Sequence, residues 1–514
     1  MPTKPARKRS KGAAHPTEAP GPESVRSLTV LDAALFAVAS FLFVGTFLAM
    51  NHRDLISTAR VADYILAGHG LDLYDAALQS MSERLVGYLP STYFVFAAWD
   101  LPLALFSGNQ PYYLTNMRAS MPGVGIYWTK LLPVGVYFVT ALLVGDILRL
   151  RGVGEKVRRV AMLFWLTSPL SFFSQFAVGQ FDIFYVALAL AGIDLYLRDR
   201  TLLGSLLFGL SFTFKYFPFI VFAPAVLYLF RDRPLEVLKH VLISLLPLLI
   251  ELAIFLPSPG FRLVALSAQS GTAGYLSNFL RGPIALGEDV SAAAILWILL
   301  TLVACMLPRK GSPGTILYLG IAATTVFALF VRWNPYWILF PASFLALLPF
   351  LSNPDREQLR VFAGLEVLIT FFFAAYQFVW WQGTMDIQMF RHVPLFRGFN
   401  PATPEASVGP SYFFLLGGRL DAHTATTLYF SGFFAAWLAA ILYGAWRVWE
   451  SGRDTLPVQA SEPASEEGAL RLTLVRFICG ALIILLPLTI AYFFGQTIQE
   501  RFVGIESMAF NAGF

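Results

Sequence analysis

The residues best suited to chemistry lie in a polar stretch, residues 51–88, that follows the first long apolar segment. That segment covers residues 28–50, carries a single charge at Asp32, and is long enough to cross a bilayer. Asp54 follows almost directly, so its carboxylate is expected where a membrane helix gives way to water. A carboxylate there can meet a substrate carried on a lipid and accept a proton from it, which makes Asp54 a candidate general base.

The residues after Asp54 have the pattern of a short amphipathic helix. Leu55, Ala59, Ala62 and Leu66 recur at helical spacing, which predicts a helix over residues 55–67 lying flat in the outer interface. Three other carboxylates in this stretch are interpreted as caps of local helices and turns: Asp63, Asp72 and Asp75.

The composition places the whole chain in a membrane. Hydrophobic residues make up 57% of the 514 residues and charged residues 13%, whereas a soluble domain carries about 25% charge. The net charge of +5 lies in a basic tail and in short loops, which records membrane orientation and does not indicate nucleic-acid binding. The two cysteines, Cys305 and Cys479, lie in apolar segments and indicate neither a disulfide framework nor a metal site.

Apolar segments recur along the chain with short polar breaks, which predicts an all-α polytopic membrane protein with roughly 12–14 transmembrane helices. The expected divisions are a disordered basic tail (1–27), a first membrane module (28–351), a second membrane module (352–494) with a long outer loop (382–425) and a cytoplasmic linker (447–471), and a short polar tail (495–514). No stretch outside the membrane is large enough to fold alone.

The basic loops predict an orientation with one conflict. Basic residues cluster at 149–159, 198–200, 231–233, 309–310 and 356–360, and the positive-inside rule places these loops and the N-terminus in the cytoplasm. Asp54, residues 179–182, residues 332–336 and loop 382–425 then lie together outside. One crossing is missing between residues 88 and 149. Three explanations of the missing crossing are open: either residues 88–106 form a re-entrant segment, or Pro133 splits the third segment, or one basic loop is placed on the wrong side.

Seven charges fall inside or beside apolar segments, where a charge costs about 2.5–3.5 kcal/mol and marks function or a buried pair. They are Asp100, Lys130, Asp146, Asp182, Lys215, Glu251 and Arg332. Lys215, with Pro218, interrupts the segment 202–230, which is either one tilted helix or two short helices that meet there. A structural role as a charge pair between helices competes with a functional role at each position. No motif of soluble nucleotide-binding chemistry is present.

Several short motifs occur in an order that can be compared with known protein families. They are residues 54–74, Tyr88-Leu89-Pro90, Lys130, Phe164-Trp165-Leu166-Thr167-Ser168-Pro169, Gly179-Gln180-Phe181-Asp182, residues 209–224 around Lys215, and Arg332-Trp333-Asn334-Pro335-Tyr336 continuing to Pro341. Over about residues 28–351 this order resembles the GT-C class of integral-membrane glycosyltransferases. It is most similar to the catalytic subunit of glycosylphosphatidylinositol mannosyltransferase I and to bacterial polyprenol-phosphate-mannose-dependent mannosyltransferases.

The resemblance implies a GT-C-like bundle that transfers a hexose, mannose in the similar enzymes, from a polyprenyl-phosphate donor to a glycolipid or cell-envelope polysaccharide. The site is expected on the non-cytoplasmic side of the cell membrane. The chain departs from the eukaryotic D-x-D motif, because Asp54-Leu55-Ile56 keeps only the first carboxylate. No metal and no cofactor are therefore expected.

The residues can be given roles from their own chemistry. An inverting transfer from a phosphate-bearing sugar needs one base, for which we select Asp54. The departing lipid phosphate needs cations, and the candidates are Arg332, Lys215 and the pair Arg391-His392. Sugar hydroxyls are assigned to Gln180, Asp182 and Asn334, with helix capping or interhelical bonding as the alternative for Gln180 and Asn334.

Two functions from other classes remain open at this point. Broken helices and intramembrane charges also suit a transporter or flippase of a lipid-linked saccharide, although no internal repeat is evident. A non-catalytic subunit of a cell-envelope assembly is the third reading. Radiolabelled polyprenyl-phosphate sugar would separate the first two, since an enzyme transfers the sugar and a flippase moves the intact lipid.

Overall fold

The computed structural model describes residues 29–81, 86–108, 111–116, 125–264, 291–307, 314–352, 354–380, 422–450 and 466–501. Every regular element in these ranges is a helix. In chain order they are α1 (Val30–Ala49), α2 (Arg53–Leu66), α3 (Leu73–Leu78), α4 (Pro90–Phe106), α5 (Tyr112–Asn116), α6 (Gly125–Leu150), α7 (Glu155–Leu166), α8 (Pro169–Phe172), η3 (Phe173–Val178), α9 (Asp182–Leu197), α10 (Thr201–Phe212), α11 (Phe219–Phe230), α12 (Pro234–Phe255), α13 (Pro259–Val264), α15 (Ala292–Met306), α16 (Thr315–Phe330), η4 (Pro335–Ile338), α17 (Leu339–Leu345), η5 (Leu348–Ser352), α18 (Arg356–Trp380), α21 (Ala422–Glu450) and α22 (Glu466–Arg501).

Six of the described helices are long and apolar enough to cross a bilayer: α1, α6, α12, α18, α21 and α22. A seventh span results if α7 and the segment after it, which are bent by 45°, are taken together. The other apolar helices in the described ranges, such as α10, α11, α15 and α16, have 10–17 residues. The chain is therefore an all-α, multi-pass membrane protein, and many of the predicted crossings are short or broken.

The breaks fall at prolines and charges. The segment around Lys215 forms two short helices, α10 and α11, with the lysine in the connection between them. α6 instead runs unbroken through Pro133. A split third segment is thus excluded as the source of the missing crossing, which leaves a re-entrant 88–106 segment or a misplaced basic loop.

The stretch after Asp54 is helical, as its apolar spacing predicts. Leu55, Ala59 and Ala62 are buried, and α2 packs on α3, α4 and α5. Asp63, on the same helix, does not cap a neighbouring turn as predicted. It is fully buried and accepts the backbone N–H groups of Tyr113 and Leu114, at 2.5 and 3.2 Å, so it holds the start of α5 from about fifty residues away.

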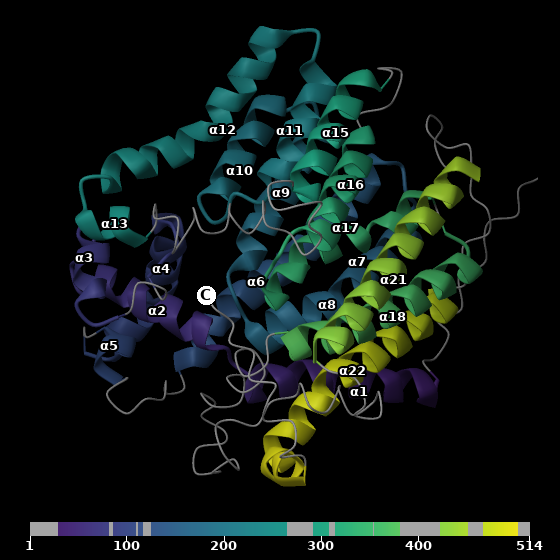
Figure 1. Cartoon of the computed structure of the whole chain (residues 1–514), viewed down its shortest axis with the longest axis horizontal. Coiled ribbons are helices and arrows are strands. Elements are labelled where there is room, and N and C mark those ends of the chain that lie inside the picture. The colour runs from purple at the N-terminus through teal and green to yellow at the C-terminus, as the bar shows by residue number, and fades with distance from the viewer. Residues whose placement is uncertain are drawn as a thin grey trace, which may run out of the picture.

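The helices form two flanks around a central group (Figure 1). α2, α3, α4 and α5 lie on one side, and α1, α18, α21 and α22 lie on the other, with α6, α9 and α17 between them. α22 contacts α1, α7 and α8, so the C-terminal helices are packed directly on the N-terminal module.

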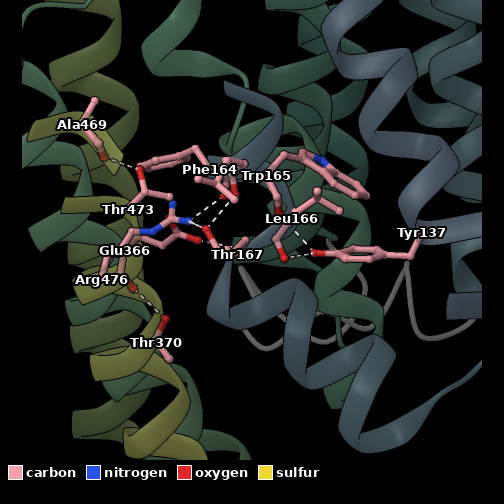
Figure 2. A network of polar contacts seen from close by, with 12 residues as sticks. Tyr137, Phe164, Trp165, Leu166, Thr167, Glu366, Thr370, Ala469, Thr473 and Arg476 are labelled. Carbon is pink, nitrogen blue, oxygen red and sulfur yellow. Dashed lines mark hydrogen bonds and ion pairs between the residues drawn. The ribbon is translucent and has the colours of Figure 1, made fainter. Parts of the chain in front are cut away.

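The break between α7 and α8 is stabilised by donors from other helices. A helix end leaves its last carbonyl groups without partners. Arg476 of α22 donates to the carbonyl of Phe164 at 2.6 Å, and the Tyr137 hydroxyl of α6 donates to the carbonyls of Trp165 and Leu166 at 3.1 and 2.9 Å (Figure 2).

A buried ion pair completes this network. Arg476 also donates to Glu366 of α18 at 2.5 Å and to the Thr167 hydroxyl at 2.9 Å (Figure 2). Ser168 donates to the other Glu366 oxygen at 2.6 Å. The side chains of Arg476 and Glu366 are 0% and 7% exposed. Arg476 and Glu366 each make further hydrogen bonds besides their own ion pair, and these bonds help to offset the cost of removing the two charges from water.

Candidate functional site

Asp54 lies in the first turn of α2, and its position is fixed by His52. The His52 Nδ1 atom accepts the backbone N–H of Asp54 at 3.2 Å and so caps the start of the helix. Because Nδ1 accepts that proton, it holds a lone pair, and its 3.7 Å approach to Asp54 Oδ2 is not an ion pair. The Asp54 side chain remains 26% exposed.

Two side chains from distant segments donate to the same oxygen of Asp54. Gln180 Nε2 lies 2.8 Å from Oδ2, and the Tyr336 hydroxyl lies 3.0 Å from it. Gln180 Nε2 also reaches the Tyr88 hydroxyl at 3.3 Å. Since an ionised carboxylate only accepts hydrogen bonds, these contacts fix the Gln180 amide with its nitrogen toward Asp54.

Gln180 stands between two helices because of the glycine before it. Gly179 ends η3 with a φ of 75°, a left-handed conformation that side chains other than glycine rarely adopt. A Cβ at this position would lie 3.0 Å from Cε of Lys130. The turn at Gly179 ends η3, so that the Gln180 side chain reaches Asp54 and α9 begins at Asp182.

Lys130 itself closes helix ends. It is fully buried, and its ammonium group donates to the carbonyls of Phe47, Met50 and Phe176 at 3.1, 2.5 and 2.6 Å. The lysine thus joins the end of α1, just before Asp54, to η3, just before Gln180. Its contacts give it a structural role that holds two parts of the site together.

Lys215 and Asp182 form a buried ion pair next to this cluster. Their side chains are 2% and 0% exposed and in direct contact. Six aromatic rings have centroids 4.9–5.9 Å from Lys215 Nζ: Tyr88, Phe181, Tyr185, Phe217, Tyr336 and Trp337. Aromatic faces stabilise a cation, so the ammonium group is held in place both by its carboxylate and by this cage.

Asn334 joins the site through Tyr336. Its side-chain Nδ2 lies 3.0 Å from the Tyr336 hydroxyl. Pro335, at the first position of η4, separates the two residues, and Ser174 of η3 donates to the carbonyl of Tyr336 at 2.8 Å. The structure therefore brings together five of the predicted site residues: Asp54, Gln180, Asp182, Lys215 and Asn334.

The remaining predicted site residues are Arg332, Arg391 and His392. Arg332 is half-buried beside Tyr376 of α18; burial lowers the pKa of its guanidinium, and the nearby Tyr376 opposes this shift. Arg391 and His392 lie outside the described residues. Within the described ranges, no three side chains of His, Cys, Asp or Glu gather as they would around a metal ion.

The other charges in the apolar segments have structural partners. Asp100 of α4 accepts the Thr129 hydroxyl of α6 at 2.8 Å, and Glu251 of α12 accepts the backbone N–H of Ser91 at 2.8 Å at the start of α4. Asp146 pairs with Arg198 and with Arg149. These charges connect helices, as the structural interpretation predicted.

Sequence reasoning missed Tyr88 and Tyr336 as members of the site, although both stand in the motifs quoted above. Tyrosines in apolar segments usually belong to the core, and this chain has 20 of them, so their type carries little signal. The useful signal for Tyr336 is its position two residues after Asn334, at the start of a helix that follows a charged break.

Comparison with known proteins gives limited information. No family model and no curated protein matches the sequence. Among solved structures, the chain is similar to ArnT from Cupriavidus metallidurans, in a crystal structure bound to undecaprenyl phosphate. The TM-score is 0.40 and the identity 14%, over 81% of this chain and 77% of that one. Values this low do not establish a common fold or a common activity.

Proposed function

We propose that this protein is a membrane glycosyltransferase that moves a hexose, with mannose as the first candidate, from a polyprenyl-phosphate donor to a glycolipid or cell-envelope polysaccharide. The observation that carries the proposal is the arrangement around Asp54. A carboxylate just after the first membrane helix is held on one oxygen by Gln180 and Tyr336, yet remains partly exposed. In this proposal the site faces the non-cytoplasmic side.

The geometry divides the two oxygens of Asp54 between two tasks. Oδ2 accepts both hydrogen bonds, and no described side chain donates to Oδ1. A general base needs a lone pair within hydrogen-bond reach of the proton it removes. In the proposed mechanism Oδ1 is that atom, and Oδ2 is the anchor.

The reaction is an inverting displacement. The acceptor hydroxyl oxygen attacks the anomeric carbon from the face opposite the phosphate, and the new glycosidic bond forms as the bond to the phosphate oxygen breaks. The hydroxyl proton passes to Asp54 Oδ1. The bonding electrons leave with the polyprenyl phosphate, whose negative charge a nearby cation stabilises.

The cations for that phosphate are proposed from outside the buried pair. Lys215 is already neutralised by Asp182 and closed off by aromatic rings, so in this conformation it supports the site instead of offering an open anion position. Arg332, half-buried and following the same helix break as Asn334, is the preferred described candidate, because a guanidinium binds phosphate oxygens through two parallel hydrogen bonds. Arg391 and His392 complete the proposed set.

The sugar contacts are proposed for amide oxygens. Gln180 and Asn334 each direct their N–H groups toward the Asp54 cluster, so their carbonyl oxygens are the proposed acceptors of sugar hydroxyls. Gln180 Oε1 is buried without a hydrogen-bond partner, so in this proposal the sugar reaches it only when the site opens. Both residues thereby link sugar binding to the position of the base.

The test is transfer from a set of radiolabelled polyprenyl-phosphate hexoses by the full-length protein in liposomes that contain a lipid extract as acceptor. We expect the wild type to transfer one of the sugars and Asp54→Asn to lose this activity. Asp72→Asn is the matched control, because the Asp72 side chain lies in the same loop, is 60% exposed and pairs with the exposed His69.

Two results would contradict the proposal. One is near-normal transfer by Asp54→Asn. The other is movement of the intact labelled lipid across the bilayer without transfer, which would favour the flippase, a function that the buried Lys215–Asp182 pair in a broken helix would also suit.

A further inference from the structure

The direction of one proton in the site follows from the chemistry of its neighbours. The Tyr336 hydroxyl lies 3.0 Å from Asn334 Nδ2 on one side and 3.0 Å from Asp54 Oδ2 on the other. A carboxylate can only accept, so the hydroxyl must donate its proton to Asp54. The amide of Asn334 then faces the hydroxyl with its nitrogen, which donates to the lone pair of the tyrosine oxygen.

This chain of donors has a consequence for Asp54. With Asn334 donating to Tyr336, the amide group occupies a lone pair of the tyrosine oxygen and does not compete with Asp54 for the tyrosine proton. Hydrogen bonds in such chains polarise and strengthen each other. The hydrogen bond to Oδ2 is therefore held in one direction, and Oδ1 receives neither of the two donors.

The backbone fixes Tyr336 before any substrate arrives. Its carbonyl accepts the Ser174 hydroxyl at 2.8 Å, and Pro335 limits the conformations of the turn that carries it. Its ring centroid lies 5.3 Å from Lys215 Nζ, within the aromatic cage. The ring that carries the hydroxyl is therefore held from the lysine side as well as from the backbone.

We infer that Tyr336 is a positioning residue for the base Asp54, and that Asn334 directs the tyrosine proton toward it. This inference rests on the proposed function and adds two roles to it. Neither residue takes up the reacting proton. They act by keeping Oδ2 occupied, so that Oδ1 receives the acceptor's proton.

The test compares Tyr336→Phe with the wild type in the liposome transfer assay. Phenylalanine keeps the ring in the cage and removes only the hydroxyl. A hydrogen bond to a charged group is worth enough to change a rate about 10- to 100-fold. We expect kcat to fall by that factor, the KM for the donor to stay unchanged, and the acid limb of the pH–rate profile to move to higher pH by about one unit. The control is Tyr64→Phe. Tyr64 lies on α2, the helix of Asp54, and its hydroxyl is hydrogen-bonded to Ser80, so its removal should leave kcat, KM and the pH profile unchanged.

A second variant tests the role of Asn334. Asn334→Ala should lower kcat and move the acid limb in the wild-type background. It should do neither in the Tyr336→Phe background, where there is no tyrosine proton left to direct. Loss of a sugar contact alone would instead raise KM equally in both backgrounds.

The outcomes separate this inference from the proposed function. If Asp54→Asn is inactive while Tyr336→Phe keeps the wild-type kcat and pH profile, the inference is wrong and the proposed base stands. If Asn334→Ala lowers kcat by the same factor in both backgrounds, its directing role is refuted. Normal transfer by Asp54→Asn removes the proposed function itself.

Discussion

Replacing Arg476 by methionine is expected to destabilise the protein strongly, because it leaves a buried carboxylate without its cation. Glu366 would keep the hydrogen bond from Ser168 and lose its 2.5 Å partner. The carbonyl of Phe164 would also lose a donor at the end of α7. Breaking a buried pair by removing one partner costs about 3–5 kcal/mol.

A double variant decides whether the stranded charge is the cause. Glu366→Leu combined with Arg476→Met removes both charges, and replacing a buried pair by apolar side chains of similar volume is often neutral. We expect the double variant to recover most of the lost stability. What remains should be the cost of the unpaired Phe164 carbonyl, about 1–3 kcal/mol.

The measurement is the free energy of unfolding in mixed micelles of dodecyl maltoside and dodecyl sulfate, followed by tryptophan fluorescence. Arg447→Met serves as control, because Arg447 pairs with Glu450 and Asp355 at 2.6 and 3.8 Å, both carboxylates are about half exposed, and such pairs contribute about 0–1 kcal/mol each. The reasoning is refuted if Arg476→Met costs no more than this control, or if the double variant is as unstable as Arg476→Met alone.

Two further predictions concern the surroundings of the site. Burial raises the pKa of Asp63 to about 6, so the folded state binds a proton that the unfolded state has released, and stability should fall as pH rises from about 4 to 6. Asp63→Asn removes this dependence. Between pH 4 and 7 the free energy of unfolding of the wild type should therefore fall by about 3 kcal/mol relative to that of Asp63→Asn. Parallel pH curves for the two proteins would contradict this. Gly179→Ala should cost about 1–2 kcal/mol and slow transfer by displacing Lys130 and Gln180, since its φ is 75° and its Cβ would crowd Lys130. Gly154→Ala, in open space at φ −62°, is the control, and equal stability of the two variants would show that the turn is not strained.

Sequence patterns predicted those elements that neighbouring residues determine. The spacing of Leu55, Ala59 and Ala62 indicated the helix after Asp54, and the structure buries that face. Lys215 and Pro218 in one apolar run indicated a break, and two short helices meet there. In both cases the residues that determine the element lie within one or two turns of each other.

Partners far apart in the sequence could not be predicted in this way. Tyr336 and Asp54 are 282 residues apart, and nothing near either residue identifies the other. Asp63 was expected to cap its own surroundings, since capping is usually local, but it holds the start of α5 instead. Which carboxylate meets which donor depends on how the helices pack.

One omission was avoidable. Glu366 and Arg476 are single charges in long apolar segments, and the rule that singled out Lys215 and Glu251 applies to them equally. A charge of each sign in two otherwise apolar helices of the same module indicates a pair. The structure shows that this pair connects α18 and α22 to the break between α7 and α8, in the segment that continues through η3 to Gln180.

The most direct test of the central claim is a single-turnover measurement with Asp54→Asn. Protein in excess over radiolabelled polyprenyl-phosphate hexose reports the chemical step, and donor binding is measured on the same preparation. If Asp54 is the base, transfer should slow by roughly 10²–10⁴-fold while donor binding and folding stay as in the wild type. Transfer at close to the wild-type rate would contradict the account and leave Asp182 as the next carboxylate to test.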